Sequence, residues 1–272
     1  MARERTVVRG IVLRAVDTKE SDKILTVLTD DGKLTVIAKG ARSRKSRVTA
    51  CTQLLAYSEL TLSESRGWQY LSEGSTIALF EEVRRDISLL SLASYFAELT
   101  EAAALENVES EAVLSLLLNA LYALGNLKRP PQQVKAAFEL KLMSLIGFEP
   151  LADACACCGR PDPKEPMLDI RSGVVCCKRC GKGAGGVPLP FAADSPTDRG
   201  PVRMPLTAGA LAALRWILYG DPKRLYSFSL AEPDLKKLAD AGEAYVHATL
   251  ERGFKTLDFY KSLQGGGAYD GK

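Results

Sequence analysis

Residues 24–37, Ile-Leu-Thr-Val-Leu-Thr-Asp-Asp-Gly-Lys-Leu-Thr-Val-Ile, decide the fold of the first third of the chain. Apolar residues beginning at Ile24 predict one strand, and Leu34 to Ile37 predict the next. Asp31-Gly32 stands between them, and Asp-Gly is a strong hairpin signal because glycine accepts the positive φ of a tight turn. The stretch therefore predicts two antiparallel neighbouring strands.

Three more strands surround this hairpin. Residues 6–16, rich in β-branched side chains, precede it, and residues 57–63 and 68–79 follow it, with Arg66-Gly67 as a turn. Five short strands within about 80 residues are typical of a small closed barrel. We therefore expect a five-stranded OB-fold domain over residues 1–79, with another five-stranded barrel, such as the SH3-like type, as the alternative.

The apolar spacing changes from strand alternation to a helical period after residue 80. In the first predicted helix, Ile87, Leu90 and Ala97 share one apolar stripe. Further helices are expected at residues 110–124 with Ser110 as cap, at 131–146, from Thr207 to about residue 220, and at 233–263. The predicted fold class is α+β, an OB-fold barrel followed by an all-α domain over residues 80–263. Residues 184–205 are expected to form a loop, and residues 264–272, with three consecutive glycines, a disordered tail.

Six of the seven cysteines cluster within a short segment of the predicted helical domain. Eighteen residues separate Cys155-x2-Cys158 from Cys177-x2-Cys180, which is the spacing of a two-knuckle zinc site. Two intervening residues let one tight turn present both sulfur atoms to a single ion. We therefore predict a zinc module over residues 152–186, inserted into the helical domain.

Two glycines select the four ligands among the six cysteines. Gly159 directly follows Cys158, and Gly181 directly follows Cys180, where a positive φ lets the chain fold back under a metal ion. Four thiolates complete the tetrahedral shell of a structural Zn²⁺ and leave no position for a reactive water. Cationic side chains near the knuckles could offset the negative charge of the site: Arg160, Lys178, Arg179 and Lys182.

Two cysteines of the cluster remain outside this ligand set, Cys157 and Cys176. Cys176 could replace Cys177 through a three-residue spacer to Cys180. Unrelated reduced thiols and disulfides are the alternatives to a metal site. An odd number of cysteines and a charged start at residues 1–9, without a signal-peptide pattern, argue against disulfides and predict a reducing cytoplasm.

Positive charge is concentrated in the predicted barrel. Residues 1–80 contain 13 Lys and Arg against 9 Asp and Glu, and no acidic residue occurs at positions 32–58. Six basic residues lie in that acid-free window: Lys33, Lys39, Arg42, Arg44, Lys45 and Arg47. The run follows the third predicted strand, so it predicts a loop or strand edge that contacts nucleic acid. A solvated basic loop is the alternative.

Aromatic residues are absent from positions 1–56. OB-folds that hold single strands tightly usually stack bases on aromatic side chains. We therefore expect nucleic-acid binding that is mainly electrostatic, independent of base sequence and not confined to single strands.

Motifs for catalysis are missing from the sequence. The single histidine, His247, lies inside a predicted helix, and there is no phosphate-binding loop, zinc-protease motif or nucleophile elbow. A closed four-thiolate shell also offers no metal-activated water. We expect that the protein is not an enzyme.

Short segments spread over residues 5–263 carry a family resemblance. They are Gly10-Ile11-Val12-Leu13-Arg14, Glu20-Ser21-Asp22, Leu28-Thr29, Gly32-Lys33, Ala38-Lys39-Gly40-Ala41-Arg42, Lys45-Ser46, Gly147-Phe148-Glu149-Pro150 and Ser172-Gly173. On these segments the chain resembles the RecO family of bacterial DNA-repair and recombination-mediator proteins. One departure is Ser172-Gly173, which stands where the family usually has Gly-Gly.

The resemblance implies a mediator that binds single- and double-stranded DNA and anneals complementary strands. Its implied partners are RecR and the C-terminal tail of single-strand-binding protein, with RecA loaded indirectly onto coated strands, and its implied location is cytoplasmic and nucleoid-associated. Lys39, Arg42 and Lys45 match the family positions for DNA contact. Charge adds four further candidates: Arg14, Lys33, Arg44 and Arg47.

Two other functions compete with a DNA mediator. A zinc-stabilised RNA-binding protein with an OB-fold is the first, and annealing of coated DNA strands would separate it from a mediator. A nucleic-acid enzyme with an unrecognised active site is the second, and the absence of metal-dependent cleavage or ATP turnover would exclude it.

Overall fold

The computed structural model describes residues 5–106, 108–181 and 202–265. The chain forms two compact units, one from Met1–Lys128 with Phe254–Lys272 and the other from Arg129–Gly253. No helix in the described segments is long and apolar enough to span a membrane. The domain boundary expected at residue 79 stays a prediction.

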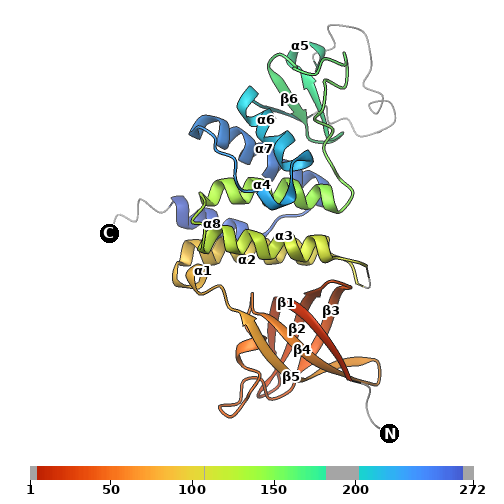
Figure 1. Ribbon diagram of the computed structural model, residues 1–272, viewed down its shortest axis with the longest axis vertical. Helices are drawn as coiled ribbons and strands as arrows, with labels where there is room; N and C mark the ends of the chain where they lie inside the picture. The colour runs from red at the N-terminus through yellow and green to blue at the C-terminus, as the bar shows by residue number, and fades with distance from the viewer. Residues whose placement is uncertain (1–4, 107, 182–201, 266–272) are drawn as a thin grey trace. The chain divides into compact units, whose positions relative to one another are not determined.

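Five strands form a closed barrel in the first unit (Figure 1). They are β1 (Arg5–Thr18), β2 (Asp22–Thr29), β3 (Gly32–Ala38), β4 (Tyr57–Ser65) and β5 (Trp68–Ala78). Their order is β1-β2-β3-β5-β4, with β4 pairing back onto β1. The β3–β5 pair is parallel, and the other four pairs are antiparallel. The predicted five-stranded OB-fold barrel is therefore confirmed, and the hairpin predicted from residues 24–37 is the β2–β3 pair.

Alternating side chains fill the barrel interior. Val12, Leu25 and Val36 are fully buried there, as the inward half of a strand alternation requires. Gly10 allows β1 and β2 to approach closely, because a Cβ atom at this position would lie 2.6 Å from Cγ1 of Val27.

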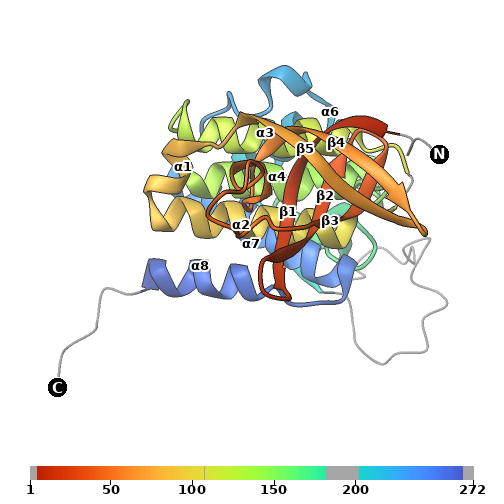
Figure 2. The same ribbon diagram turned by 90° about the horizontal axis from the view of Figure 1, so that it is seen from below.

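Four α-helices, α1 (Glu81–Arg85), α2 (Ile87–Ala103), α3 (Glu111–Gly125) and α8 (Lys255–Gly265), and a short 3-10 helix, Ala50–Thr52, complete the described part of the first unit. Figure 2 shows α8 running alongside α2, and these two helices make extensive contacts. The Glu98 carboxylate of α2 accepts a hydrogen bond of 3.1 Å from the backbone N–H of Thr256. Tyr95 and Phe254 pack edge to face with ring centroids 5.5 Å apart. These contacts attach the C-terminal helix to the N-terminal unit.

The prediction of a single helix after residue 80 is wrong, because the structure has two helices there, α1 and α2. Asp86 divides them, because its carboxylate accepts hydrogen bonds from the backbone N–H groups of Ser88 (2.8 Å) and Leu89 (3.1 Å) and starts a new helix. Ile87 then occupies the first turn and is 60% exposed rather than on the buried face. Ser110 precedes α3 as expected, but its hydroxyl donates to the carbonyl oxygen of Val108 and does not cap the helix.

The second unit combines helices with a small three-stranded sheet. The helices are α4 (Pro131–Leu145), α5 (Lys178–Gly181), α6 (Ala208–Tyr219) and α7 (Glu232–Leu250), and the sheet order is β7 (Val174–Cys177), β6 (Pro166–Asp169), β8 (Arg203–Pro205). Thr207 caps α6 as predicted, since its hydroxyl accepts from the N–H of Ala210 at 3.0 Å. Gly147 follows α4 with a φ of 92°, which suits a residue without a side chain.

Three expectations for the C-terminal half require correction. The helix expected at residues 233–263 is two helices, because Glu251 adopts a φ of 50° after α7. Residues 203–205, expected to be loop, form β8 against β6. Gln264 and Gly265, expected in the tail, end α8. The remainder of the expected loop up to residue 201 and of the expected tail lies outside the described residues.

A buried ion cluster joins α4 to α7 inside the second unit. The Lys135 ammonium lies 2.8 Å from a carboxylate oxygen of Glu139 and 2.9 Å from one of Glu243. Burial lowers the pKa of Lys135, but the two carboxylates outweigh this effect and raise it above its ordinary value. Lys135 therefore stays charged and compensates two acidic groups that would otherwise be costly to bury.

We expect Lys135→Met to destabilise the protein by about 3–5 kcal/mol, because it leaves buried carboxylates without their cation. Urea unfolding followed by circular dichroism measures the change. Lys236→Met, at an exposed position of α7, is the matched control and should change the stability by less than about 0.5 kcal/mol. Equal stability of the two variants would contradict a stabilising role for the cluster.

Candidate metal centre and nucleic-acid interface

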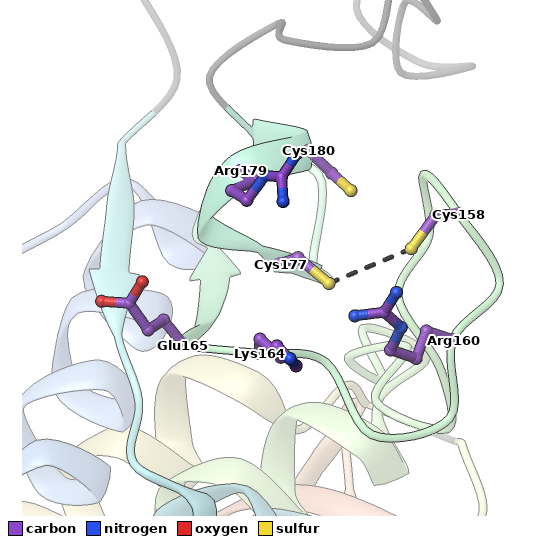
Figure 3. Close-up of a pocket in the computed structure, with 7 residues that line it drawn as sticks. All are labelled: Cys158, Arg160, Lys164, Glu165, Cys177, Arg179 and Cys180. Atoms are coloured by element: carbon purple, nitrogen blue, oxygen red, sulfur yellow. Dashed lines mark hydrogen bonds between the residues drawn. The ribbon is translucent and has the colours of Figure 1, made fainter.

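Four cysteines from two separate segments meet in the second unit. The sulfur atoms of Cys155, Cys158, Cys177 and Cys180 all lie within 4.8 Å of one another. Figure 3 shows the sulfur atoms of Cys158, Cys177 and Cys180 facing the same space, with 3.9 Å between those of Cys158 and Cys177. This is the set selected by spacing and glycines in the sequence, and the cluster could hold a metal ion.

Local backbone structure explains why the two segments meet. Gly159 has a φ of 70° and donates its N–H to the carbonyl oxygen of Cys155 at 2.8 Å, so the first knuckle folds back on itself. The second pair spans the end of β7 and α5, which places Cys177 and Cys180 on one side of a tight turn. The N–H of Cys177 donates to the Cys155 sulfur at 3.2 Å and ties the two segments together.

Helix α6 holds the base of this cysteine module. The Arg215 guanidinium donates to the carbonyl oxygens of Ala152 (2.6 Å), Asp153 (3.0 Å) and Pro161. The hydroxyl of Tyr219, also on α6, accepts from the N–H of Ala152 at 3.1 Å. The module is therefore fixed to the helices of the second unit independently of the cysteines.

The thiols differ in acidity. Burial raises the pKa of Cys155, but backbone N–H groups, foremost that of Cys177, outweigh it and lower the pKa to about 6. Burial raises the pKa of Cys177, and a hydrogen bond with the Cys158 thiol raises that of Cys180 to about 12. Cys155 therefore loses its proton more readily than Cys177 or Cys180, from which a metal ion would have to displace protons.

Cationic groups surround the sulfur atoms. Arg160 and Arg179 line a cavity of about 390 Å³ together with Cys158, Cys177 and Cys180 (Figure 3). The positions of Arg160 and Arg179 thus support the expectation that cationic side chains offset the negative charge of the thiolates. Lys178 instead pairs with Glu165, and Lys182 lies outside the described residues.

The two remaining cysteines of the cluster contact each other. The sulfur atoms of Cys157 and Cys176 are 3.4 Å apart, and with Cys155 they form a group of three. Three sulfur atoms are one short of a structural zinc shell, whereas the other group supplies four. Soft thiolates are the ligands that zinc prefers in such closed sites. The donor set therefore fits a structural Zn²⁺ better at Cys155, Cys158, Cys177 and Cys180.

The basic run forms a loop after β3, anchored at several backbone positions. Ala41 is fully buried in the barrel core. The N–H of Gly40 donates to the Asp22 carboxylate (2.8 Å), and that of Arg42 donates to the carbonyl oxygen of Ser21 (2.9 Å). Five side chains on this loop are exposed: Lys39, Arg42, Arg44, Lys45 and Arg47. We call this segment, residues 39–47, the basic loop.

The two other predicted DNA contacts, Arg14 and Lys33, interact with helix α2 and are not part of the basic loop. Both meet Glu101 of α2, with Arg14 at 2.9 Å from its carboxylate and the Lys33 ammonium at 2.9 Å from its carbonyl oxygen. These interactions attach α2 to the outside of the barrel. The predicted positions therefore divide into five on an exposed loop and two engaged with a helix.

An aromatic side chain beside the basic loop was missed in the sequence. The Lys39 ammonium lies 4.7 Å from the ring centroid of Tyr70, on β5. The two residues are 31 positions apart, and the parallel β3–β5 pairing brings them together. Although residues 1–56 contain no aromatic residue, the folded chain therefore places one, Tyr70, beside the basic loop.

Replacing Cys158 by Ser should remove most of the bound zinc, because it breaks the four-thiolate shell. Cys157→Ser, the adjacent position, is the matched control and should keep the metal. Metal analysis of both purified variants by mass spectrometry measures the difference. If Cys157→Ser lost as much zinc as Cys158→Ser, the assignment of the four ligands would be wrong.

Comparison with known proteins covers nearly the whole chain. Residues 1–80 match the family model "Recombination protein O N terminal", and residues 84–258 match "Recombination protein O C terminal". The DNA repair protein RecO of Acetivibrio thermocellus is 31% identical over 255 residues, covering 93% of this chain and 95% of that protein. That of Symbiobacterium thermophilum is 33% identical over 258 residues, covering 94% and 97%. The chain therefore belongs to the recombination protein O (RecO) family.

Proposed function

We propose that this protein is a non-enzymatic mediator of DNA repair and recombination, which binds DNA phosphates through the basic loop. The observation that carries the proposal is the exposure of five cations on one anchored loop, Lys39 to Arg47. Membership of a family whose curated members are named DNA repair proteins supports it. Arg14 and Lys33 are second-rank contacts, since both engage Glu101 of α2 instead of lying on the basic loop.

Contacts to phosphate explain binding without base specificity. Lysine and arginine side chains that neutralise phosphates release counterions, and this term does not depend on the base sequence. With about five phosphates neutralised, the logarithm of affinity for duplex DNA should fall with the logarithm of salt at a slope of roughly −4 to −5. Single and double strands would both bind, because both present the same backbone charge.

Strand annealing follows from the same electrostatics and requires no catalytic side chain. Two complementary strands repel each other through their phosphates. A protein that neutralises both backbones lets the bases meet more often, and phosphate contacts leave the base edges free to pair. In this proposal RecR and the acidic tail of single-strand-binding protein bring the protein to coated strands, on which RecA is then loaded.

Zinc has a structural role in this proposal. Four thiolates occupy every tetrahedral position, so the metal stabilises the second unit and takes no part in a reaction. DNA binding belongs to the basic loop of the first unit.

Replacing Arg42, Lys45 and Arg47 together by Ala should weaken binding to all DNA sequences alike and reduce the magnitude of the salt slope by about 2–3. The loss of three phosphate contacts is the reason. Fluorescence anisotropy titrations at several salt concentrations, on oligonucleotides of different sequence, measure both effects. A variant with Lys223, Lys236 and Lys237 replaced by Ala removes the same charge from exposed positions of the second unit and should keep the slope. A sequence-dependent loss would contradict phosphate contact.

Annealing of complementary strands coated with single-strand-binding protein tests the mediator function directly. The unaltered protein should accelerate annealing, and the basic-loop triple variant should lose most of this acceleration at equal concentration. The appearance of duplex is followed with a fluorophore and quencher on opposite strands. Tight binding to RNA without annealing of coated DNA would instead favour an RNA-binding OB-fold protein.

A further inference from the structure

A row of apolar side chains crosses the outside of the barrel. Val16 on β1 is paired with Ile24 on β2, Ile24 with Ile37 on β3, and Ile37 with Tyr70 on β5. The pairing is continuous over four neighbouring strands, so the four side chains form one line across the sheet. We call Val16, Ile24, Ile37 and Tyr70 the outer row.

The outer row is not part of the barrel core. Its neighbours in sequence, Leu25 and Val36, point inward and are fully buried, whereas Val16 and Ile24 are 45% and 39% exposed. In the next row along the strands, Thr26 is only 7% exposed, and its hydroxyl donates to the Glu101 carboxylate of α2 at 3.2 Å. Helix α2 thus covers this face at Thr26 and leaves Val16 and Ile24 exposed, with Ile37 and Tyr70 half-buried.

Trp68 extends the exposed surface at the start of β5. It lies two residues before Tyr70, so both side chains are on the same face of the strand. Its neighbour across β4 is Ser65, beside the tight turn at Arg66 and Gly67. Trp68 is 53% exposed, so much of its indole is available to a ligand.

Charge beside the row favours a polyanion as its occupant. The Lys39 ammonium is held over the Tyr70 ring, and the rest of the basic loop continues from that point. Two nearby carboxylates are already engaged, that of Asp17 with Arg42 at 3.3 Å and that of Asp22 with the N–H of Gly40. A ligand with apolar planar groups along an anionic backbone matches both parts of this surface.

We propose that the outer row and Trp68 bind the bases of single-stranded nucleic acid, with one base stacked on the Trp68 indole. This inference rests on the proposed nucleic-acid binding and adds a preference for single strands, because bases in a duplex already stack on each other. Tyr70 acts as a positioning residue that holds Lys39 beside the phosphates of the bound strand. Every base has a π-face, so stacking adds affinity without reading sequence.

The test compares two ligands that differ only in their bases. Affinities are measured for an oligothymidylate and for an abasic oligonucleotide of the same length, at one salt concentration. Trp68→Ala should weaken oligothymidylate binding roughly five- to 150-fold, the range for one lost stacking contact, and leave abasic binding unchanged. Tyr122→Ala removes an equally exposed aromatic residue from α3 and should change neither affinity.

Fluorescence provides a second readout that leaves the Trp68 side chain in place. In a Trp216→Phe background Trp68 is the remaining tryptophan, and oligothymidylate should quench its emission while the abasic strand should not. Trp68→Phe should retain more affinity than Trp68→Ala, because a phenyl ring still stacks.

Three results would overturn the inference: equal affinity of the unaltered protein for both ligands, an equal loss on both in Trp68→Ala, or unquenched emission. A protein partner on the outer row would give the first of these. Failure of the proposed function looks different, since neither ligand would then bind and the basic-loop triple variant would have no effect.

Discussion

The parallel pairing of β3 with β5 is the constraint on which the N-terminal unit depends. Val36 opposite Gln69 and Ile37 opposite Tyr70 close the sheet into a barrel, so that no strand edge is left open at this point. The same pairing brings Tyr70 under Lys39, although the two residues are far apart in the chain. Charge from the first part of the barrel and aromatic surface from its last strand therefore occur together only after closure.

Nucleic-acid binding on this barrel would combine an electrostatic contribution that depends on salt with a stacking contribution that depends little on salt. The basic loop provides a long-range attraction to phosphates that is screened by salt. The outer row and Trp68 would add short-range contact with bases, which is nearly insensitive to salt and available only on unpaired strands. In the second unit, the Lys135 cluster joins α4 to α7, and Arg215 of α6 holds the cysteine module.

Sequence patterns predicted those parts of the structure in which residues near in the chain control the outcome. Asp31-Gly32, Thr207 and the two Cys-x2-Cys pairs act over a few residues, and the strands, the α6 cap and the sulfur cluster follow them. Helix boundaries failed where one side chain changed the local balance. The Asp86 carboxylate begins α2 anew, and the positive φ of Glu251 ends α7, while the period of apolar residues continues across both.

The family, the five strands of the barrel and the cluster of four cysteines could be predicted from motif and spacing, because each signal lies in residues a short distance apart. The outer row could not be predicted in this way. The register of four strands aligns Val16, Ile24, Ile37 and Tyr70, and no spacing along the chain encodes that alignment. The engagement of Arg14 and Lys33 with Glu101 was hidden for the same reason. Charge can be counted in a sequence, but which charges remain free for a ligand depends on what the folded chain places next to them.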